Sequence, residues 1–532
     1  MKRFLHGLAL WLLVAAAAPA QDLPPDLRRA LEAFSEADLN DGPEVAAELL
    51  PRLDVLLKTL PDHEPRAHQV VERFLATLVR ADPGEHRRAL RRRALLALGQ
   101  IARSRASGRL LLRLGRDDAS RGASLALQAA IGALPPGDAL SEILSKGVLH
   151  RDAAVRERVL RGLSRMRRPE SRSLARASGT LILRGLTSPK PSLRAASAEA
   201  ASGLRLETSI APLLSLVHDA DPLVRQAVAR SLTSFATKDP VRTGLALLAD
   251  DDHERVRELA FEALGHSGNL LDAGILVAAM TKEARRNRFA IARALRKLTG
   301  LDLGAEPGPW EGWWRATRRH IETSGGTPMR FVPGATSRYA AQWYGIPVES
   351  DRILFILDVS MSMRFGGNQD EPSRMERAKE ELIRTLESLD AETRFGILAF
   401  STGVGHFDRR GLVRADATTR ARAARWVKSL TPAGGTDTYG ALCAALRLSD
   451  EVDTLYFLSD GVPSRGLIKD PDHILDRLHA FNAVRRVRIH TVALLNWAPG
   501  MTDDAESENA AVAARFMEEL AAQNDGRFVR IE

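Results

Sequence analysis

Two patterns of hydrophobic and polar positions divide the chain. From about Pro24 to Gly300, apolar residues recur at the spacing of amphipathic helices, one helix after another. After Ser350 the chain changes to short, almost wholly apolar runs that alternate with amphipathic helices. Such runs are typical of strands buried on both faces, and their alternation with helices predicts a mostly parallel sheet covered by helices.

A short phrase recurs in the helical part: a polar turn, then Val or Leu, then Arg, then a helix rich in small residues. Its arginines stand at positions 156, 194, 225, 257 and 288, in steps of 38, 31, 32 and 31 residues. A period of this length predicts stacked helix pairs that bury their apolar faces against their neighbours. We expect Asp or Ser to cap the second helix, Pro191 and Pro222 to lie in its first turn, and the arginines to bond to the adjacent repeat.

The best copy of the phrase, Asp221-Pro222-Leu223-Val224-Arg225, resembles the HEAT repeat family. The resemblance covers roughly residues 40–300 and implies a curved α-solenoid that serves as a binding surface. An irregular helical domain with chance periodicity is the alternative. Residues 301–349 contain glycines and prolines, Pro307 among them, that are expected to break helices. They also contain a predicted helix with three tryptophans on one face. We therefore expect a linker and a capping helix here.

Oxygen-bearing side chains follow the apolar runs of the C-terminal part. The first run ends in Asp358, with Ser360 and Ser362 at alternate positions after it, and the run over residues 454–459 is followed by Asp460. Thr436 lies between them, after two glycines. Because ligands of open sheets bind at the carboxyl ends of strands, we expect these side chains to meet. Two carboxylates and three hydroxyls suit a hard cation such as Mg²⁺ and do not suit Zn²⁺, whereas helix capping is the alternative for each residue taken alone.

Together these five positions resemble the von Willebrand factor type A (VWA) domain and its metal-ion-dependent adhesion site, over about residues 350–532. The resemblance implies a doubly wound, Rossmann-like α/β fold. It also implies that Ser360 and Ser362 ligate the metal directly, Thr436 directly or through one water, and Asp358 and Asp460 through water. The sixth position would accept an Asp or Glu of a protein partner. Mg²⁺ is the expected ion, with Mn²⁺ and Ca²⁺ as alternatives, and Asp437 is expected to support the site without touching the ion.

Residues 1–20 have the pattern of a secretory signal: two basic residues, an apolar run from Phe4 to Ala18, and a small-residue cleavage site that ends at Ala20. We therefore expect an exported chain, periplasmic or secreted, with an uncleaved anchor as the alternative. No later stretch is long and apolar enough to span a membrane. The only cysteine, Cys443, lies in an apolar helical run, so an intramolecular disulfide is excluded and the thiol is expected to be buried.

The formal net charge of +9 comes mostly from arginines scattered at helical spacing, which indicates solvated helix faces. Together with export, this argues against a nucleic acid partner. The sequence holds no phosphate-binding loop, HExxH motif or nucleophile elbow, so we do not expect an enzyme.

The predicted chain is therefore multidomain: a signal peptide (1–20), an all-α HEAT-like solenoid (25–300), a linker with a Trp-rich capping helix (301–349) and a VWA domain (350–532). The predicted function is an exported protein-binding scaffold. In it the metal site binds an acidic residue of a partner and the solenoid gives a second surface. The alternative is a metal-assisted hydrolase or an assembly subunit of a separate enzyme.

Overall fold

A computed structural model of the chain describes residues 65–80, 88–117, 121–166, 179–180, 182–323, 341–365, 372–485, 487–495 and 504–531, with scattered positions between 25 and 60. Its contacts divide the chain into two compact units, Met1–Ser267 and Gly268–Glu532. The predicted signal peptide and residues 324–340 of the predicted linker lie outside the described residues. Within the described ranges, no helix is both long enough and apolar enough to cross a membrane.

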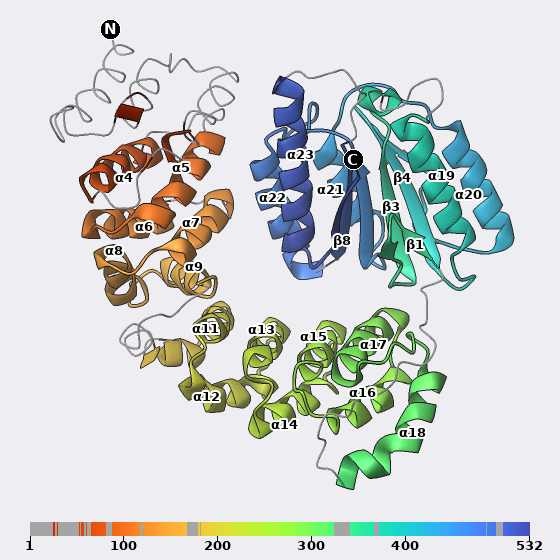
Figure 1. The fold of residues 1–532 in the computed structure, drawn as a ribbon, viewed down its shortest axis with the longest axis horizontal. Helices are drawn as coiled ribbons and strands as arrows, with labels where there is room; N and C mark the ends of the chain where they lie inside the picture. The colour runs from red at the N-terminus through yellow and green to blue at the C-terminus, as the bar shows by residue number, and fades with distance from the viewer. Residues whose placement is uncertain are drawn as a thin grey trace. The chain divides into compact units, whose positions relative to one another are not determined.

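The described part of the first unit is built of helices (Figure 1). Helices α5, α7, α9, α11, α13 and α15 each pack against the next one in this series, as the repeat period predicts. The helices of the first unit are α4 (Pro65–Arg80), α5 (Arg88–Ile101), α6 (Arg105–Asp117), α7 (Arg121–Ala133), α8 (Asp138–Glu142), α9 (Ala153–Leu163), α11 (Pro191–Gly203), α12 (Ile210–Ser215), α13 (Pro222–Leu232), α14 (Asp239–Leu248) and α15 (Glu254–Leu264).

The recurring arginines tie each repeat together and link it to the next. Arg194, Arg225 and Arg257 each donate to the backbone carbonyl six residues earlier, at 2.8–2.9 Å, and so close the turn before their own helix. Arg194 also forms a bidentate ion pair with Asp219 of the following repeat, and Arg225 forms one with Asp251. The shortest N–O distance in each pair is 2.7 Å. The predicted bond to the adjacent repeat is therefore confirmed at these two arginines.

Helix starts in the first unit follow the predicted chemistry only in part. Asp152 and Asp221 cap α9 and α13 with their side chains, and Pro191 and Pro222 are the first residues of α11 and α13. Helix α11 has no side-chain cap, and His253 caps α15 in place of an aspartate or serine. The Nδ1 atom of His253 accepts from the Arg255 N–H. An imidazole nitrogen thus replaces the expected carboxylate or hydroxyl as acceptor for a backbone N–H of the first helical turn, which has no partner within the helix.

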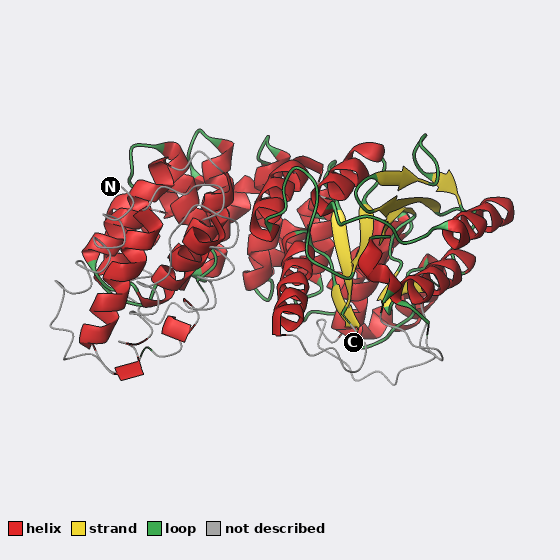
Figure 2. Cartoon of the chain, turned by 90° about the horizontal axis from the view of Figure 1, so that it is seen from above, coloured by secondary structure: helices red, strands yellow, loops and turns green. Residues whose placement is uncertain are grey.

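The second unit combines three helices with an α/β domain, and all described strands belong to it (Figure 2). The helices are α16 (Asp272–Met280), α17 (Arg285–Thr299), α18 (Pro307–Thr323), α19 (Arg374–Glu387), α20 (Ala417–Ser429), α21 (Thr438–Leu448), α22 (Pro471–Arg485) and α23 (Asp504–Gln523). The strands are β1 (Gln342–Trp343), β2 (Ile346–Pro347), β3 (Arg352–Asp358), β4 (Arg394–Phe400), β5 (Val404–His406), β6 (Val413–Arg414), β7 (Thr454–Ser459), β8 (Arg488–Leu494) and β9 (Phe528–Ile531).

The main sheet has the order β5-β4-β3-β7-β8-β9, and β6 also pairs with β4. Strands β3, β4, β7, β8 and β9 are parallel, which confirms the predicted mostly parallel sheet, whereas β5 and β6 are antiparallel to β4. The strand order reverses between the neighbours β3 and β7, the place where doubly wound folds bind their ligands.

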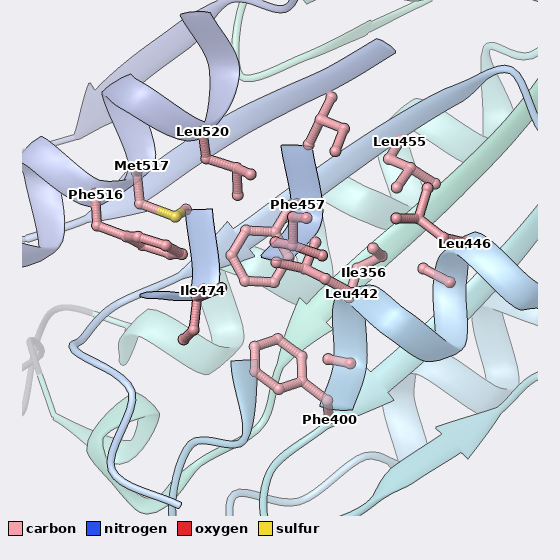
Figure 3. Close-up of a cluster of buried hydrophobic side chains, with 14 of the residues drawn as sticks. Ile356, Phe400, Leu442, Leu446, Leu455, Phe457, Ile474, Phe516, Met517 and Leu520 are labelled. Carbon is pink, nitrogen blue, oxygen red and sulfur yellow. The ribbon is translucent and has the colours of Figure 1, made fainter. Parts of the chain in front are cut away.

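Helices cover both faces of this sheet, with α19 and α20 on one face and α21, α22 and α23 on the other (Figure 1). Figure 3 shows the second of these cores, in which Ile356, Phe400 and Phe457 of the sheet meet Leu442 of α21 and Phe516 of α23. Neighbouring strand residues such as Phe355 point to the opposite core. Because both faces are buried, the strands read as continuous apolar runs.

Two local predictions are wrong. Pro307 was expected to break a helix but is the first residue of α18, since a first-turn residue has no intrahelical N–H bond to lose. Cys443 was expected to be buried, but it is only half-buried and packs at the border of the core between the sheet and α21.

A buried acid anchors α17 at the edge of the sheet where the parallel strands begin. The Glu349 side chain is 3% exposed and forms ion pairs with Arg527 at 2.9 Å, with Arg488 at 3.6 Å and with Arg293 of α17. Arg286 of α17 also donates to the backbone carbonyl of Asp453, at 3.1 Å. Helix α17 is thus bound to the α/β domain within the second unit, at the edge opposite the strand ends that carry the candidate site.

Arg225→Ala tests the link between repeats. The Arg225 and Asp251 side chains are 12% and 7% exposed, so removing the arginine leaves a buried carboxylate without its main partner. We expect a loss of about 3 kcal/mol of unfolding free energy, measured by urea denaturation with circular dichroism. The matched control is Arg230→Ala on the same helix, where the side chain is exposed and the expected change is within about 0.5 kcal/mol. Equal effects of the two substitutions would contradict this role.

Candidate metal centre

The candidate site lies where three loops meet at the carboxyl edge of the sheet. Asp358 ends β3, and Asp460 directly follows β7, which pairs in parallel with β3 and so ends at the same level. The loop that carries Thr436 is bound to the first loop by two backbone hydrogen bonds, from Ala433 N to Val359 O at 2.8 Å and from Met361 N to Gly434 O at 3.0 Å. The register of two strands and two backbone bonds therefore bring the predicted residues to one place.

Four of the five predicted site residues form a continuous chain of contacts. The Ser360 N–H donates to Asp358 Oδ1 at 2.8 Å, and the hydroxyls of Ser360 and Ser362 lie 3.0 Å apart. The Ser362 hydroxyl then donates to Asp460 Oδ1 at 2.9 Å. Asp358, Ser360 and Asp460 are buried, whereas Ser362 is half-buried. Ser459 completes the set, since its hydroxyl donates to Asp358 Oδ2 at 2.6 Å.

Thr436 joins this group through its loop. It is buried, its N–H donates to Ser464 Oγ at 3.0 Å, and its carbonyl accepts from the N–H groups of Ser464 and Arg465. These bonds fix its backbone, and its hydroxyl would be the oxygen that it offers to an ion. The neighbouring Asp437 caps α21 by accepting from Gly440 N at 2.8 Å, and thereby fixes the loop that carries Thr436.

The two carboxylates of the site share an unfavourable electrostatic environment. Burial raises the pKa of Asp358 to about 7, and the negative charge of Asp460 adds to the shift. Burial also raises the pKa of Asp460, although the charge of Arg374 opposes this effect. Both carboxylates thus lose solvation, and Asp358 also meets a second negative charge. A bound cation would relieve both penalties.

Arg374 belongs to this site and was not predicted. It is the first residue of α19, its side chain is 1% exposed, and its Nη1 donates to Asp460 Oδ2 at 3.0 Å. One signal was present in the sequence, because an arginine directly after the capping Ser373 places positive charge at a helix N-terminus, where the helix dipole disfavours it. Such a residue needs a specific anionic partner.

The spacing of the oxygen atoms fits a small, hard divalent ion. Neighbouring ligands of an octahedral ion with metal–oxygen distances of roughly 2.1 Å lie roughly 3.0 Å apart. The separation from Ser360 Oγ to Ser362 Oγ (3.0 Å) matches this value, and without an ion this contact is a hydrogen bond. The Ser362 hydroxyl is also oriented by its hydrogen bond to Asp460 Oδ1 at 2.9 Å. In the described part of the chain, no group of three or more His, Cys, Asp and Glu side chains is placed to hold a metal. The donor set at this edge is instead rich in hydroxyls.

The fold and the site define the class of the second unit's main domain, a doubly wound α/β domain with an oxygen-lined strand edge. Family models agree on both halves of the chain. HEAT repeats match residues 137–232, 179–265 and 210–296, and the von Willebrand factor type A domain matches residues 353–462. The chain therefore contains HEAT repeats (137–296) followed by a VWA domain (353–462).

Several known proteins are similar to part of the chain. Inter-alpha-trypsin inhibitor heavy chain H2 of Homo sapiens is 31% identical over 128 residues, 22% of this chain and 13% of that protein. The same protein of Mesocricetus auratus is 27% identical over 183 residues, 34% of this chain and 18% of that protein. The chain thus spans less than a fifth of the length of these relatives.

Among solved structures, the von Willebrand factor type A protein from Catenulispora acidiphila is 21% identical, with a TM-score of 0.27, and the match covers 34% of this chain and 38% of that one. The PilB minor pilin from Streptococcus sanguinis is 14% identical, with a TM-score of 0.25, over 35% of this chain and 58% of that one. Their low TM-scores give these structures no weight in the assignment.

Gly466→Ala tests the packing of the loops at the site. Gly466 has φ of +94°, and a Cβ there would lie 1.9 Å from Asp437 Oδ1, so alanine is both strained and in collision with the cap of α21. We expect a loss of about 2 kcal/mol or more of unfolding free energy, measured by chemical denaturation. Gly403→Ala is the control, because open space surrounds that position, and its effect is expected to be small. A Gly466→Ala protein as stable as the control would contradict the observed loop packing.

Proposed function

We propose that the site holds one divalent cation, Mg²⁺ first, and through it binds an acidic residue of a protein partner. Ser360 and Ser362 would ligate the ion directly, Thr436 directly or through one water, and Asp358 and Asp460 through water. The observation that carries the proposal is the 3.0 Å spacing from Ser360 Oγ to Ser362 Oγ, beside the two buried carboxylates of Asp358 and Asp460. Oxygen donors at this spacing suit Mg²⁺, while Mn²⁺ and Ca²⁺ remain alternative ions.

The surroundings of the site support a protein ligand. Met361 lies in the first loop between Ser360 and Ser362, and Phe365 follows three residues after Ser362. Their side chains are 44% and 60% exposed, so they offer apolar surface beside the site. An acidic residue bound to the ion would bring its neighbours onto this apolar surface, and fully covered apolar contacts supply most of the energy of protein interfaces. The HEAT repeats would provide a second binding surface, since stacked repeats form extended concave faces.

Binding fits the site better than catalysis. Asp358 accepts hydrogen bonds on both carboxylate oxygens, from Ser360 N and Ser459 Oγ, and Asp460 is held by Ser362 and Arg374. These contacts hold both carboxylates in fixed orientations, which suits the positioning of a bound ion and of the water that it coordinates. We therefore propose a binding scaffold, not an enzyme.

Metal binding is tested by isothermal titration with Mg²⁺ and Mn²⁺. The wild-type protein is expected to bind one ion, and Asp358→Ala and Ser362→Ala to weaken that binding at least about tenfold, because each removes an oxygen from the site. Ser429→Ala is the matched control, since this residue is exposed on α20 and its hydroxyl donates to the Trp426 carbonyl of the same helix. A wild-type protein that binds neither ion would refute the proposed centre.

Partner binding is tested by affinity capture from the extracellular or periplasmic fraction, with the wild type and Asp358→Ala as baits. A genuine partner is expected to be retained with Mg²⁺, released by a chelator, and not captured by Asp358→Ala. When the acidic residues of the partner are changed one at a time to the corresponding amides, one of these substitutions is expected to abolish capture. Partners that bind equally with and without metal would contradict recognition through the ion.

We also propose that the chain is exported. The basic start, the apolar run and the small-residue site that ends at Ala20 support this. N-terminal sequencing of the mature protein is expected to begin at Gln21, and Ala18→Arg is expected to block cleavage, because cleavage requires a small residue at that position. A mature chain that begins at Met1 in the cytoplasmic fraction would overturn the proposal.

A further inference from the structure

Arg374 places a buried positive charge against the candidate metal centre. Its Nη1 lies 3.0 Å from Asp460 Oδ2, and the side chains of these two residues are 1% and 0% exposed. The other oxygen of Asp460, Oδ1, accepts from the Ser362 hydroxyl at 2.9 Å. One carboxylate is therefore shared between a guanidinium and the group of hydroxyls that would hold the ion.

Arg374 is held at a position that costs stability. Ser373 and Glu376 already complete the cap of α19 through a capping box, so the helix start does not need an arginine. Positive charge in the first turn opposes the helix dipole, and burial removes the guanidinium from water. The ion pair with Asp460 compensates these costs, which points to a role at the centre rather than in the helix.

Resting on the metal-binding function above, we propose that Arg374 sets the affinity of the centre for its cation and makes the bound ion depend on an acidic partner. With both carboxylates ionised, Asp358, Asp460 and Arg374 together carry one net negative charge. A divalent ion then leaves the centre net positive, and a partner carboxylate neutralises it. Without Arg374 the same ion would make the centre neutral, so the ion would bind more tightly and attract a carboxylate less.

Arg374→Gln separates this role from a purely structural one, because glutamine can still donate to Asp460 but carries no charge. We expect Arg374→Gln to bind Mn²⁺ about tenfold or more tightly than the wild type, measured by isothermal titration. A structural role alone predicts the opposite, a loss of affinity. Acetate serves as a probe for the partner carboxylate, and it is expected to raise the Mn²⁺ affinity of the wild type more than that of Arg374→Gln.

Two further variants control for charge and position. Arg374→Lys keeps the positive charge and is expected to have an Mn²⁺ affinity close to that of the wild type. Arg384→Gln makes the same charge change on the same helix, at a side chain that is 74% exposed, and is expected to leave the affinity unchanged because solvent screens it. If Arg374→Gln raises the Mn²⁺ affinity and Arg384→Gln does not, the effect is due to the buried charge of Arg374.

The outcomes also separate this inference from the function on which it rests. A wild type that binds no metal refutes the proposed centre. A wild type that binds, beside a folded Arg374→Gln with equal or weaker affinity, refutes only the role of Arg374. If Arg374→Gln is unstable without metal, its melting temperature is followed as Mn²⁺ is added, and a shift no larger than that of the wild type overturns the inference.

Discussion

The structure of the site depends on the burial of two carboxylates at the ends of neighbouring parallel strands. The β3–β7 pairing fixes Asp358 and Asp460 at one edge of the sheet, and burial removes both from water. The surrounding groups offset this cost, since Ser459 and the Ser360 N–H hold Asp358, while Ser362 and Arg374 hold Asp460. Few arrangements make such burial tolerable, and a cation between the carboxylates is the most direct one.

The main elements of the fold could be predicted because each leaves a strong local pattern. Strands such as β3 are buried on both faces, so nearly every residue between Ile353 and Leu357 must be apolar. Each helical repeat carries an arginine that bonds to the turn before its helix, so an arginine recurs in the sequence at the repeat period. Strands β5 and β6 have three and two residues, too few to show a period, and therefore escaped prediction.

The candidate site was predictable where its residues follow strand ends, because the topology brings such ends together. Asp358, Ser360, Ser362 and Asp460 meet for this reason, and Thr436 follows through its glycine-rich loop. Arg374 could not be found in the same way. It is one of 76 basic residues, and its place after the capping Ser373 indicates only that it needs an anionic partner. The structure shows that this partner is Asp460.

The two halves of the chain place their charged groups differently. In the HEAT repeats, arginine–aspartate pairs such as Arg225 with Asp251 link successive turns and stabilise the stack. In the VWA domain, the Arg374–Asp460 pair lies at the candidate site, where under the proposed function it would change the net charge that an ion meets. Pairs of the same chemistry therefore link repeats in one half and, in the role proposed for Arg374, would adjust a binding site in the other.

The central claim is tested most directly by diffraction from crystals of the protein grown with Mn²⁺, with data collected at the manganese absorption edge. The account predicts one anomalous peak at the edge formed by β3 and β7, within roughly 2.2 Å of Ser360 Oγ and Ser362 Oγ. A site without an anomalous peak, or a peak bound by other residues while these hydroxyls stay hydrogen-bonded to each other, would contradict it.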